Sequence, residues 1–397
     1  MNQKKQSSYG DSDMEVYFDN AATTRCEKRA AELMQRILLE DYGNPSSLHK
    51  KGMEAEAHMK TAASQLARIL KVAEKELIFT SGGTESNNLA LIGTAFANRR
   101  AGKHIITTAI EHASVYNPLI FLEEQGFEVT YLPVDHAGVL SLEALEQAVR
   151  DDTILVSMMH VNNEIGTIEP VEQAAELIHE KNPGTLIHVD AIQSFGKLRI
   201  YPRRMGIDLL SASGHKIHGP KGVGFLYVKE RTKIKPFIYG GGQQKNMRSG
   251  TENVAGVAAL GAAAETIYEN FDEKIARLYE LRAYFAEKLQ ALEGVTLNGA
   301  SGEKSAPHIV SAAFAGIRAE VLLHALEGRG IYVSTGSACS SNHPAISGTL
   351  RAIGVKRELL DATVRFSMSV ESTREEADYV IGQLAELLPQ IRRFRRR

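Results

Sequence analysis

Short apolar segments alternate with amphipathic segments over residues 76–230, and this alternation limits the fold more than any other feature of the sequence. The intervening segments, such as Ser141–Arg150 and Val171–Lys181, have helical periodicity. Such alternation predicts an α/β fold with a mainly parallel sheet covered by helices on both faces. The predicted strands are Glu76–Thr80, His104–Ile110, Glu128–Val134, Thr153–His160, Thr185–Asp190, Asp208–Ala212 and Gly222–Val228.

The rest of the chain predicts a second, smaller α/β domain, because 397 residues exceed what one simple core holds. A long helical stretch, Glu252–Leu292, precedes mixed strands and helices. These are the strands His308–Phe314, Tyr332–Ser334 and Thr363–Ser369 and the helices Ala319–Gly328 and Arg374–Arg393. We therefore expect a flexible leader over residues 1–14, a large domain over 15–262 whose first residues can pack on the small domain, and a small domain over 263–397.

Composition excludes several classes of protein. The formal net charge of −2 argues against a nucleic-acid binder, and no apolar run approaches the ~20 residues of a membrane-spanning helix. The polar stretch Met1–Asp13 lacks the apolar core of a signal peptide. Two distant cysteines, Cys26 and Cys339, give neither a disulfide framework nor a zinc pattern, so we expect no metal and a reducing, cytoplasmic setting. The arginine-rich end, Arg392–Arg397, is either a solvated tail or a docking patch for an acidic partner or RNA phosphates.

Lys216 lies among small residues in the stretch Ser211-Ala-Ser-Gly-His-Lys-Ile-His-Gly-Pro-Lys-Gly222. Small neighbours let a bulky ring approach the backbone, and Ser213 and His215 offer polar groups to a phosphate. A lysine amine in such a site loses its proton more readily than a solvated one and can form a Schiff base. The stretch indicates either a site for an aldehyde cofactor or a surface lysine beside a glycine-rich turn.

Polar residues follow several predicted strands, at the sheet edge where ligands bind in α/β proteins. Gly83 and Thr84 open a helix, whose free amides attract phosphate. His112 could stack on an aromatic cofactor and move protons, and Asn163 could bond a ring substituent. Each of these residues also has a purely structural interpretation, as a helix cap, a helix start or a turn.

Asp190 ends an apolar strand, where a buried carboxylate is costly without a cationic partner. A protonated pyridine nitrogen would be such a partner and would make the ring a better electron sink. A structural salt bridge is the alternative. One further strand separates Asp190 from Lys216, which places the two on neighbouring segments of one sheet edge.

The order of these motifs resembles that of the class V aminotransferase family of fold-type I pyridoxal-phosphate enzymes. Within that family it is most similar to the cysteine desulfurases of the NifS and IscS group, which serve iron–sulfur assembly and tRNA thiolation. The resemblance covers nearly the whole chain. Its motifs are Tyr17-Phe-Asp-Asn-Ala-Ala-Thr-Thr24, Tyr42-Gly-Asn-Pro-Ser-Ser47, Thr84-Glu-Ser-Asn-Asn88, Glu111-His112, His188-Val-Asp190, Ser213-Gly-His-Lys216, Met247-Arg-Ser-Gly-Thr251 and Arg365-Phe-Ser367.

The resemblance implies that the chain binds pyridoxal 5′-phosphate as a homodimer. Lys216 would bind the aldehyde, Asp190 would pair with the pyridine nitrogen, and Gln193 would bond the phenolic oxygen. The residues implied to hold the cofactor are Gly83, Thr84, His112, Asn163, Asp190, Gln193, Ser213, His215, Lys216 and, toward the neighbouring subunit's phosphate, Thr251. Asn163 and Arg365 would hold the substrate carboxylate, which suits the planar fork of arginine.

Among the reactions of this family, Cys339 points to the removal of sulfur from cysteine. The loop Ser334-Thr-Gly-Ser-Ala-Cys339 resembles the persulfide loop of desulfurases, whereas Cys26 falls in no motif. The resemblance implies that Lys216, His112 and Cys339 are catalytic, and that L-cysteine yields L-alanine and a Cys339 persulfide. The acceptor would be a protein: an iron–sulfur scaffold, a tRNA-thiolating enzyme or a thiamine-pathway carrier.

Two alternatives share part of this pattern. A selenocysteine lyase, or another enzyme with the class V aminotransferase fold, would also need Lys216 and Asp190. A non-enzymatic scaffold for sulfur relay would need neither, and the presence of both together with His112 and Cys339 argues against it.

Replacing Cys339 with alanine is expected to abolish sulfur transfer from L-cysteine, because the accepting thiolate is gone, and largely to spare selenium release from selenocysteine. The measurement is sulfide and selenide released from the two substrates. Cys26→Ala is the matched control and should keep both activities. Sulfur release that survives in Cys339→Ala would point to a lyase that does not need the thiol.

Overall fold

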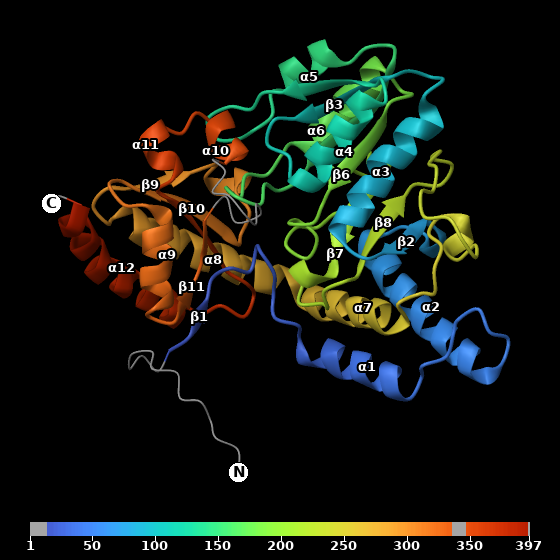
Figure 1. The fold of residues 1–397 in the computed structure, drawn as a ribbon, viewed down its shortest axis with the longest axis horizontal. Helices are drawn as coiled ribbons and strands as arrows, with labels where there is room; N and C mark the ends of the chain where they lie inside the picture. The colour runs from blue at the N-terminus through green and yellow to red at the C-terminus, as the bar shows by residue number, and fades with distance from the viewer. Residues whose placement is uncertain (1–13, 336–346, 396–397) are drawn as a thin grey trace.

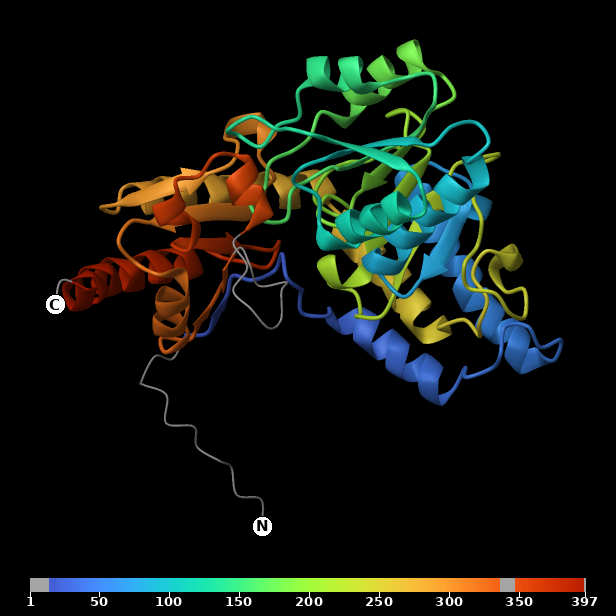
Figure 2. The ribbon, with the colours of Figure 1, turned by 45° about the horizontal axis from the view of Figure 1, so that its top comes forward.

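The computed structural model describes residues 14–335 and 347–395, so Cys339 lies outside the described residues. Two α/β units lie side by side, and the consecutive helices α7 and α8 lead from the larger unit to the smaller one (Figures 1 and 2). Among the described residues, no helix is long and apolar enough to cross a membrane.

The larger unit is built on a seven-stranded sheet. All neighbouring strands are parallel except β8, which is antiparallel to both of its neighbours, so the predicted mainly parallel sheet is confirmed. Across the sheet the order is β2 (Leu77–Thr80), β8 (Gly224–Val228), β7 (Leu209–Ser213), β6 (Leu186–Asp190), β5 (Thr153–Met159), β3 (His104–Thr108) and β4 (Glu128–Leu132).

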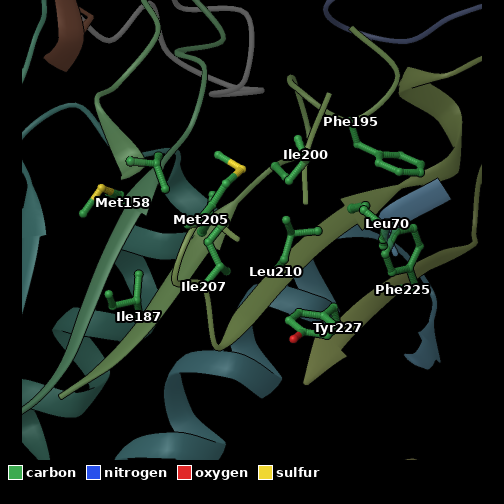
Figure 3. Close-up of a cluster of buried hydrophobic side chains, with 14 of the residues drawn as sticks. Leu70, Met158, Ile187, Phe195, Ile200, Met205, Ile207, Leu210, Phe225 and Tyr227 are labelled. Atoms are coloured by element: carbon green, nitrogen blue, oxygen red, sulfur yellow. The ribbon is translucent and has the colours of Figure 1, made fainter. Parts of the chain in front are cut away.

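Helices cover both faces of this sheet. Successive residues of a strand point to opposite faces, and both sets are apolar, so each face has to be buried. Leu209 and Leu226 pack beneath the helices α3 (Gly83–Asn98) and α4 (Ala113–Glu124). Leu210, Phe225 and Tyr227 pack on the other face, shown in Figure 3. That face is covered by α2 (Lys50–Leu70), α5 (Leu142–Ala148), α6 (Val171–Lys181) and α7 (Val254–Tyr268), and α1 (Lys28–Leu39) packs on α7.

The smaller unit has its own core around a four-stranded antiparallel sheet. The sheet order is β12 (Ser334–Thr335), β13 (Thr363–Ser367), β10 (Ile309–Phe314) and β9 (Val295–Asn298). Its helices are α8 (Phe271–Gln290), α9 (Ala319–Glu327), α10 (Gly348–Ala352), α11 (Arg357–Leu360) and α12 (Arg374–Arg395). Phe285 lies at the centre of this core, with ring centroids 5.5 Å from Phe18 and 5.3 Å from Phe366.

The predicted helical stretch Glu252–Leu292 contains two helices, α7 and α8. Glu269 is extended and Asn270 adopts a left-handed backbone conformation with φ of 50°, and together they break the helical path. Leu260 of α7 belongs to the core of the larger unit, and Phe285 of α8 belongs to that of the smaller one. The limits of the two domains stay a prediction.

The first described segment of the chain joins both units. Strand β1 (Val16–Tyr17) pairs in parallel with β11 (Ile331–Tyr332) of the smaller unit. The next residues bind Ser367 on β13: its carbonyl oxygen accepts the Asn20 side-chain amide at 3.0 Å, and its hydroxyl accepts the Ala21 N–H at 2.8 Å. The segment then meets the larger unit, where Thr24 N–H donates to the carbonyl of His215 at 2.8 Å.

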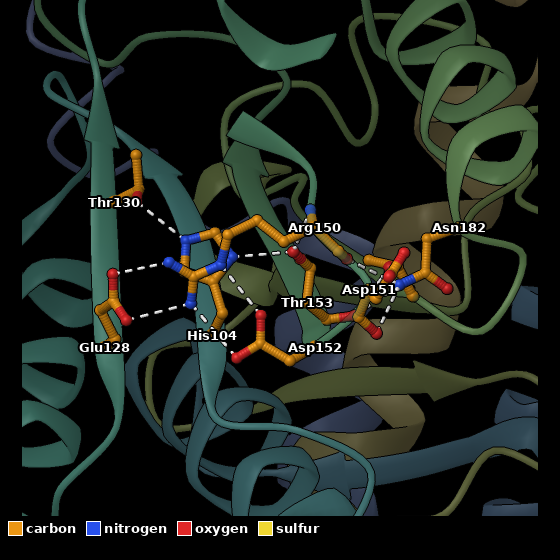
Figure 4. A network of polar contacts seen from close by, with 9 residues as sticks. His104, Glu128, Thr130, Arg150, Asp151, Asp152, Thr153 and Asn182 are labelled. Carbon is orange, nitrogen blue, oxygen red and sulfur yellow. Dashed lines mark hydrogen bonds and ion pairs between the residues drawn. The ribbon is translucent and has the colours of Figure 1, made fainter. Parts of the chain in front are cut away.

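A polar network ties strands together at their amino ends (Figure 4). The imidazole of His104 on β3 bonds the hydroxyls of Thr153 at 2.7 Å and Thr130 at 2.8 Å, one on each neighbouring strand. Burial lowers the pKa of His104, so its ring is neutral at pH 7. Arg150 nearby pairs with Glu128 at 2.7 Å. This network fixes strand register and leaves the opposite, carboxyl edge of the sheet for the site.

Candidate active site

Asp190 ends β6 as a buried carboxylate held by two donors. Its Oδ2 accepts the Asn87 side-chain amide at 2.8 Å, and its Oδ1 accepts the Ile192 N–H at 2.9 Å. Burial raises the pKa of Asp190, while these hydrogen bonds and the nearby His112 and Lys216 act in the opposite direction. A cation placed against Asp190 would favour its charged form, which suits a protonated ring nitrogen.

A chain of hydrogen bonds connects Asp190 to His112. The Asn87 amide that binds Asp190 also donates to Ser114 Oγ at 2.9 Å. Ser114 in turn contacts His112 Nδ1 through its hydroxyl at 2.8 Å, and its main-chain N–H donates to the same nitrogen at 3.1 Å. Because Nδ1 accepts a main-chain N–H, the neutral imidazole carries its proton on Nε2. The chain therefore fixes both the orientation and the tautomer of His112.

Lys216 and Gln193 converge on one carbonyl oxygen. Lys216 follows β7 in a short 3-10 turn, and its Nζ donates to the carbonyls of Ala21 at 2.5 Å and Ala22 at 2.7 Å. The Gln193 side-chain amide donates to Ala21 as well, at 2.9 Å. The structure thus brings together the two residues predicted to bond the aldehyde and the phenolic oxygen of pyridoxal phosphate.

The turn before α3 offers room and donors for a phosphate. Gly82 has φ of 147°, which side chains rarely adopt, and a Cβ on it would lie 3.7 Å from Ser213 Oγ. A Cβ at Gly83 would lie 2.1 Å from Ile192 Cδ1, so any larger residue there would have to displace the Ile192 side chain. Ser213 Oγ is buried and has no hydrogen-bond partner among the described residues. This unsatisfied hydroxyl and the first amides of α3, where Thr84 lies exposed, fit a phosphate group.

His215 is held beside Lys216 by the N-terminal segment. Its Nδ1 lies 3.2 Å from Thr23 Oγ1. Burial lowers the pKa of His215 to about 4, and the charge of Lys216 acts in the same direction. The ring is therefore neutral at pH 7 and can donate one hydrogen bond without adding a charge.

The smaller unit contributes Arg365, on β13, to the site. Its guanidinium is almost fully buried and donates to Asp19 Oδ1 at 2.9 Å and to the main-chain carbonyl of Asn163 at 2.8 Å. Its Nε is buried and has no hydrogen-bond partner among the described residues. The two residues predicted to bind the substrate carboxylate are therefore adjacent, although Asn163 contacts Arg365 through its main chain. The role of the Asn163 side chain stays a prediction.

Two predicted features lie apart from this cluster. Thr251 is exposed on the loop before α7, and within the described ranges no hydrogen bond joins it to the strand-end residues, so its role toward a neighbouring subunit stays a prediction. Arg392 of the arginine-rich end donates to the carbonyls of Glu293 at 2.7 Å and Ala315 at 3.3 Å. That side chain anchors α12 to the smaller unit.

Sequence reasoning assigned no role to Asn87, Ser114 or Asp19. Asn87 could have been identified from the sequence, because it lies one helical turn after Gly83 and therefore on the same helix face, the one that turns toward the sheet. Asp19 lies in a recognised motif, but its partner Arg365 is distant in sequence, and only the fold shows the pair.

Comparisons with known proteins agree with this arrangement. The family described as Aminotransferase class-V matches residues 16–380. The curated "Cysteine desulfurase IscS" of Dictyoglomus turgidum is 44% identical over 379 residues, which cover 95% of this chain and 95% of that protein. A solved "NIFS-LIKE PROTEIN" is 41% identical with a TM-score of 0.90 and covers 95% of this chain and 100% of its own. The structure "SspA in complex with cysteine" is 34% identical with a TM-score of 0.76, over 90% of this chain and 100% of its own.

Gly83→Ala is expected to weaken pyridoxal-phosphate binding by roughly tenfold, because the added Cβ meets the Ile192 side chain at 2.1 Å and overpacking costs about 1–3 kcal/mol. The measurement is the dissociation constant for the cofactor, taken from its absorbance on titration into apoprotein. Gly382→Ala is the matched control, because a Cβ there meets nothing within 4 Å. Equal affinities in the two variants would contradict the assignment of this turn to the phosphate.

Proposed function

Because the chain belongs to the class V aminotransferase family, as its motifs predicted, we propose that it is a pyridoxal-phosphate-dependent cysteine desulfurase. It removes the sulfur of L-cysteine and leaves L-alanine. The observation that carries the proposal is the convergence, on one sheet edge, of Lys216, the buried Asp190 and the oriented His112. The fold-type I α/β architecture agrees with this assignment.

The residues at the sheet edge fit the cofactor. Ser213 Oγ and the amides of the Gly83 turn suit its phosphate, Asp190 suits its ring nitrogen, and Lys216 suits its aldehyde carbon. When bound, pyridoxal phosphate supplies an electron sink for the amino acid attached to it.

Lys216 and His112 handle protons. The carbonyls of Ala21 and Ala22 hold the amine of Lys216 at a fixed point, from which it takes the α-proton of the substrate. His112 exchanges a proton with the substrate thiol through Nε2, because Nδ1 is occupied by Ser114. The two groups therefore act on different atoms of the same substrate.

Arg365 binds the substrate carboxylate. Asp19 and the Asn163 carbonyl fix the plane of its guanidinium. The Nε–H, which has no partner among the described residues, would form a bidentate pair with the carboxylate together with a second N–H beside it. Glu164 lies nearby and accepts the Ser347 hydroxyl at 2.5 Å. Burial raises the pKa of Glu164, so it competes less for Arg365 than an exposed carboxylate would.

Cys339 accepts the sulfur. Its thiolate attacks the sulfur of L-cysteine; a sulfur–sulfur bond forms, the carbon–sulfur bond breaks with its electron pair left on carbon, and that carbon is protonated to give alanine. The net result is one alanine and one persulfide for each cysteine. A cytoplasmic location would keep the thiol reduced, and an acceptor protein, such as an iron–sulfur scaffold or a tRNA-thiolating enzyme, would take the sulfur.

The assembly is a homodimer. Five large apolar side chains are exposed at the end of α1, at the start of α2 and on the loop between them, and Leu48 among them is 97% exposed. They are Leu38, Leu39, Tyr42, Leu48 and Met53. Such a concentration of apolar surface favours burial against another chain, and a second copy is the partner that would also make use of the exposed Thr251.

The desulfurase assignment is tested by incubating the yellow holoprotein with L-cysteine and a thiol reductant, which should yield alanine and sulfide in equal amounts. Arg365→Lys should raise KM by roughly ten- to hundredfold, because an ammonium cannot reproduce the bidentate pair. Arg318→Lys, at an exposed arginine, is the control. An unchanged KM in Arg365→Lys would place the carboxylate elsewhere, and alanine from selenocysteine alone would support a lyase.

Leu48→Glu is expected to weaken the dimer by roughly a hundredfold or more, because a carboxylate would be buried without a partner. Sedimentation equilibrium of the holoprotein measures this. Val321→Glu, at an exposed apolar residue on α9, should leave the dimer intact. A Leu48→Glu protein that remains as tightly associated as the wild type would exclude this face as the interface.

A further inference from the structure

Lys197 is a buried lysine in direct contact with the main chain of Lys216. It follows the turn after β6, its side chain is almost fully buried, and its Nζ donates to the Lys216 carbonyl at 2.5 Å. Within residues 14–335 and 347–395, no carboxylate lies within ion-pair distance of this amine. Burying a lysine without a carboxylate is costly, and this hydrogen bond places the amine of Lys197 against the main chain of Lys216.

Several basic groups surround the two lysines. Burial, together with the smaller effect of the charge of Lys216, lowers the pKa of Lys197 to about 7. His215, His218 and His308 all have pKa values lowered by burial, with the positive charge of Lys197 adding to the effect in each case. The histidines are therefore neutral at pH 7, whereas Lys197 is partly protonated at pH 7 and carries its full positive charge only below that pH.

We propose that Lys197 is a positioning residue that fixes the Lys216 main chain and whose positive charge weakens proton binding by the Lys216 amine. The inference rests on the proposed function, because that reaction needs Lys216 without its extra proton. A like charge close to a lysine favours its neutral form. Among the described residues, the groups that interact electrostatically with Lys216 are Asp190, which opposes this effect, the neutral His215 and His308, and Lys197.

The charge and the hydrogen bond of Lys197 are separable. Lys197→Met removes both, Lys197→Gln keeps a donor without the charge, and Lys197→Arg keeps a donor with a permanent charge. If the charge matters, the first two variants must change the proton affinity of Lys216 upward, whereas the arginine must leave it unchanged or lower it. A role in packing alone predicts no such difference in sign.

The test is a pH titration of the holoprotein, followed by the absorbance of lysine-bound pyridoxal phosphate. In Lys197→Met and Lys197→Gln the midpoint is expected to rise by up to about one pH unit, because the like charge that these variants remove is only partly present at pH 7. In Lys197→Arg it should stay at the wild-type value or fall. Lys181→Met is the matched control, because Lys181 also donates to a carbonyl, that of Glu146 at 2.5 Å, but lies exposed at the end of α6.

The titration midpoints of the three variants support or overturn the proposed role of Lys197. A wild-type midpoint in Lys197→Gln, with cofactor fully bound, would overturn the proposal even if Lys197→Met fails to fold. A rise in all three variants would overturn it too, because the charge would then be irrelevant. If both neutral variants fail to fold, a midpoint in Lys197→Arg above that of the wild type overturns the proposal, and one at or below it supports the proposal. Failure of the desulfurase assignment would show instead in the wild type, as absence of the cofactor band or of alanine.

Discussion

The site depends on one physical constraint, the burial of the Asp190 carboxylate at the end of β6. A carboxylate there is tolerated only with hydrogen bonds and a cation, and the surrounding residues supply the first and are arranged to receive the second. Asn87 binds Asp190 and Ser114 at once, so the same amide that stabilises the carboxylate also orients His112. In the proposed reaction, electron withdrawal and proton transfer would therefore both depend on one connected group of side chains.

Much of the fold could be predicted from local pattern. The helix Val171–Lys181 has the predicted bounds, and the strand predicted over Thr153–His160 ends one residue earlier, at Met159. These elements are long apolar or strictly periodic segments whose burial is decided by their own sequence. The division between α7 and α8 was not predicted, because it depends on a left-handed Asn270, for which the apolar pattern carries no signal.

The sequence indicated site residues where polar side chains directly follow a strand, and it gave no indication of contacts between residues that are distant in the chain. Asp190, Lys216, Gln193 and Ser213 lie together at one edge because strand ends are ordered by topology. The pairing of Asp19 with Arg365 joins residues near opposite ends of the chain, and the contact of Lys197 with Lys216 is made to a main-chain carbonyl. Neither kind of contact can be recognised from the local sequence pattern.

The crossing segment at residues 18–24 has a consequence for the order of assembly during translation. It supplies the carbonyls that hold Lys216, yet its own position is fixed by Ser367, near the end of the chain. This segment therefore gains its contacts at Ser367 only once β13 has been synthesised. A product truncated before β13 would keep the residues of the large sheet but lose the contacts that help to hold these carbonyls against Lys216.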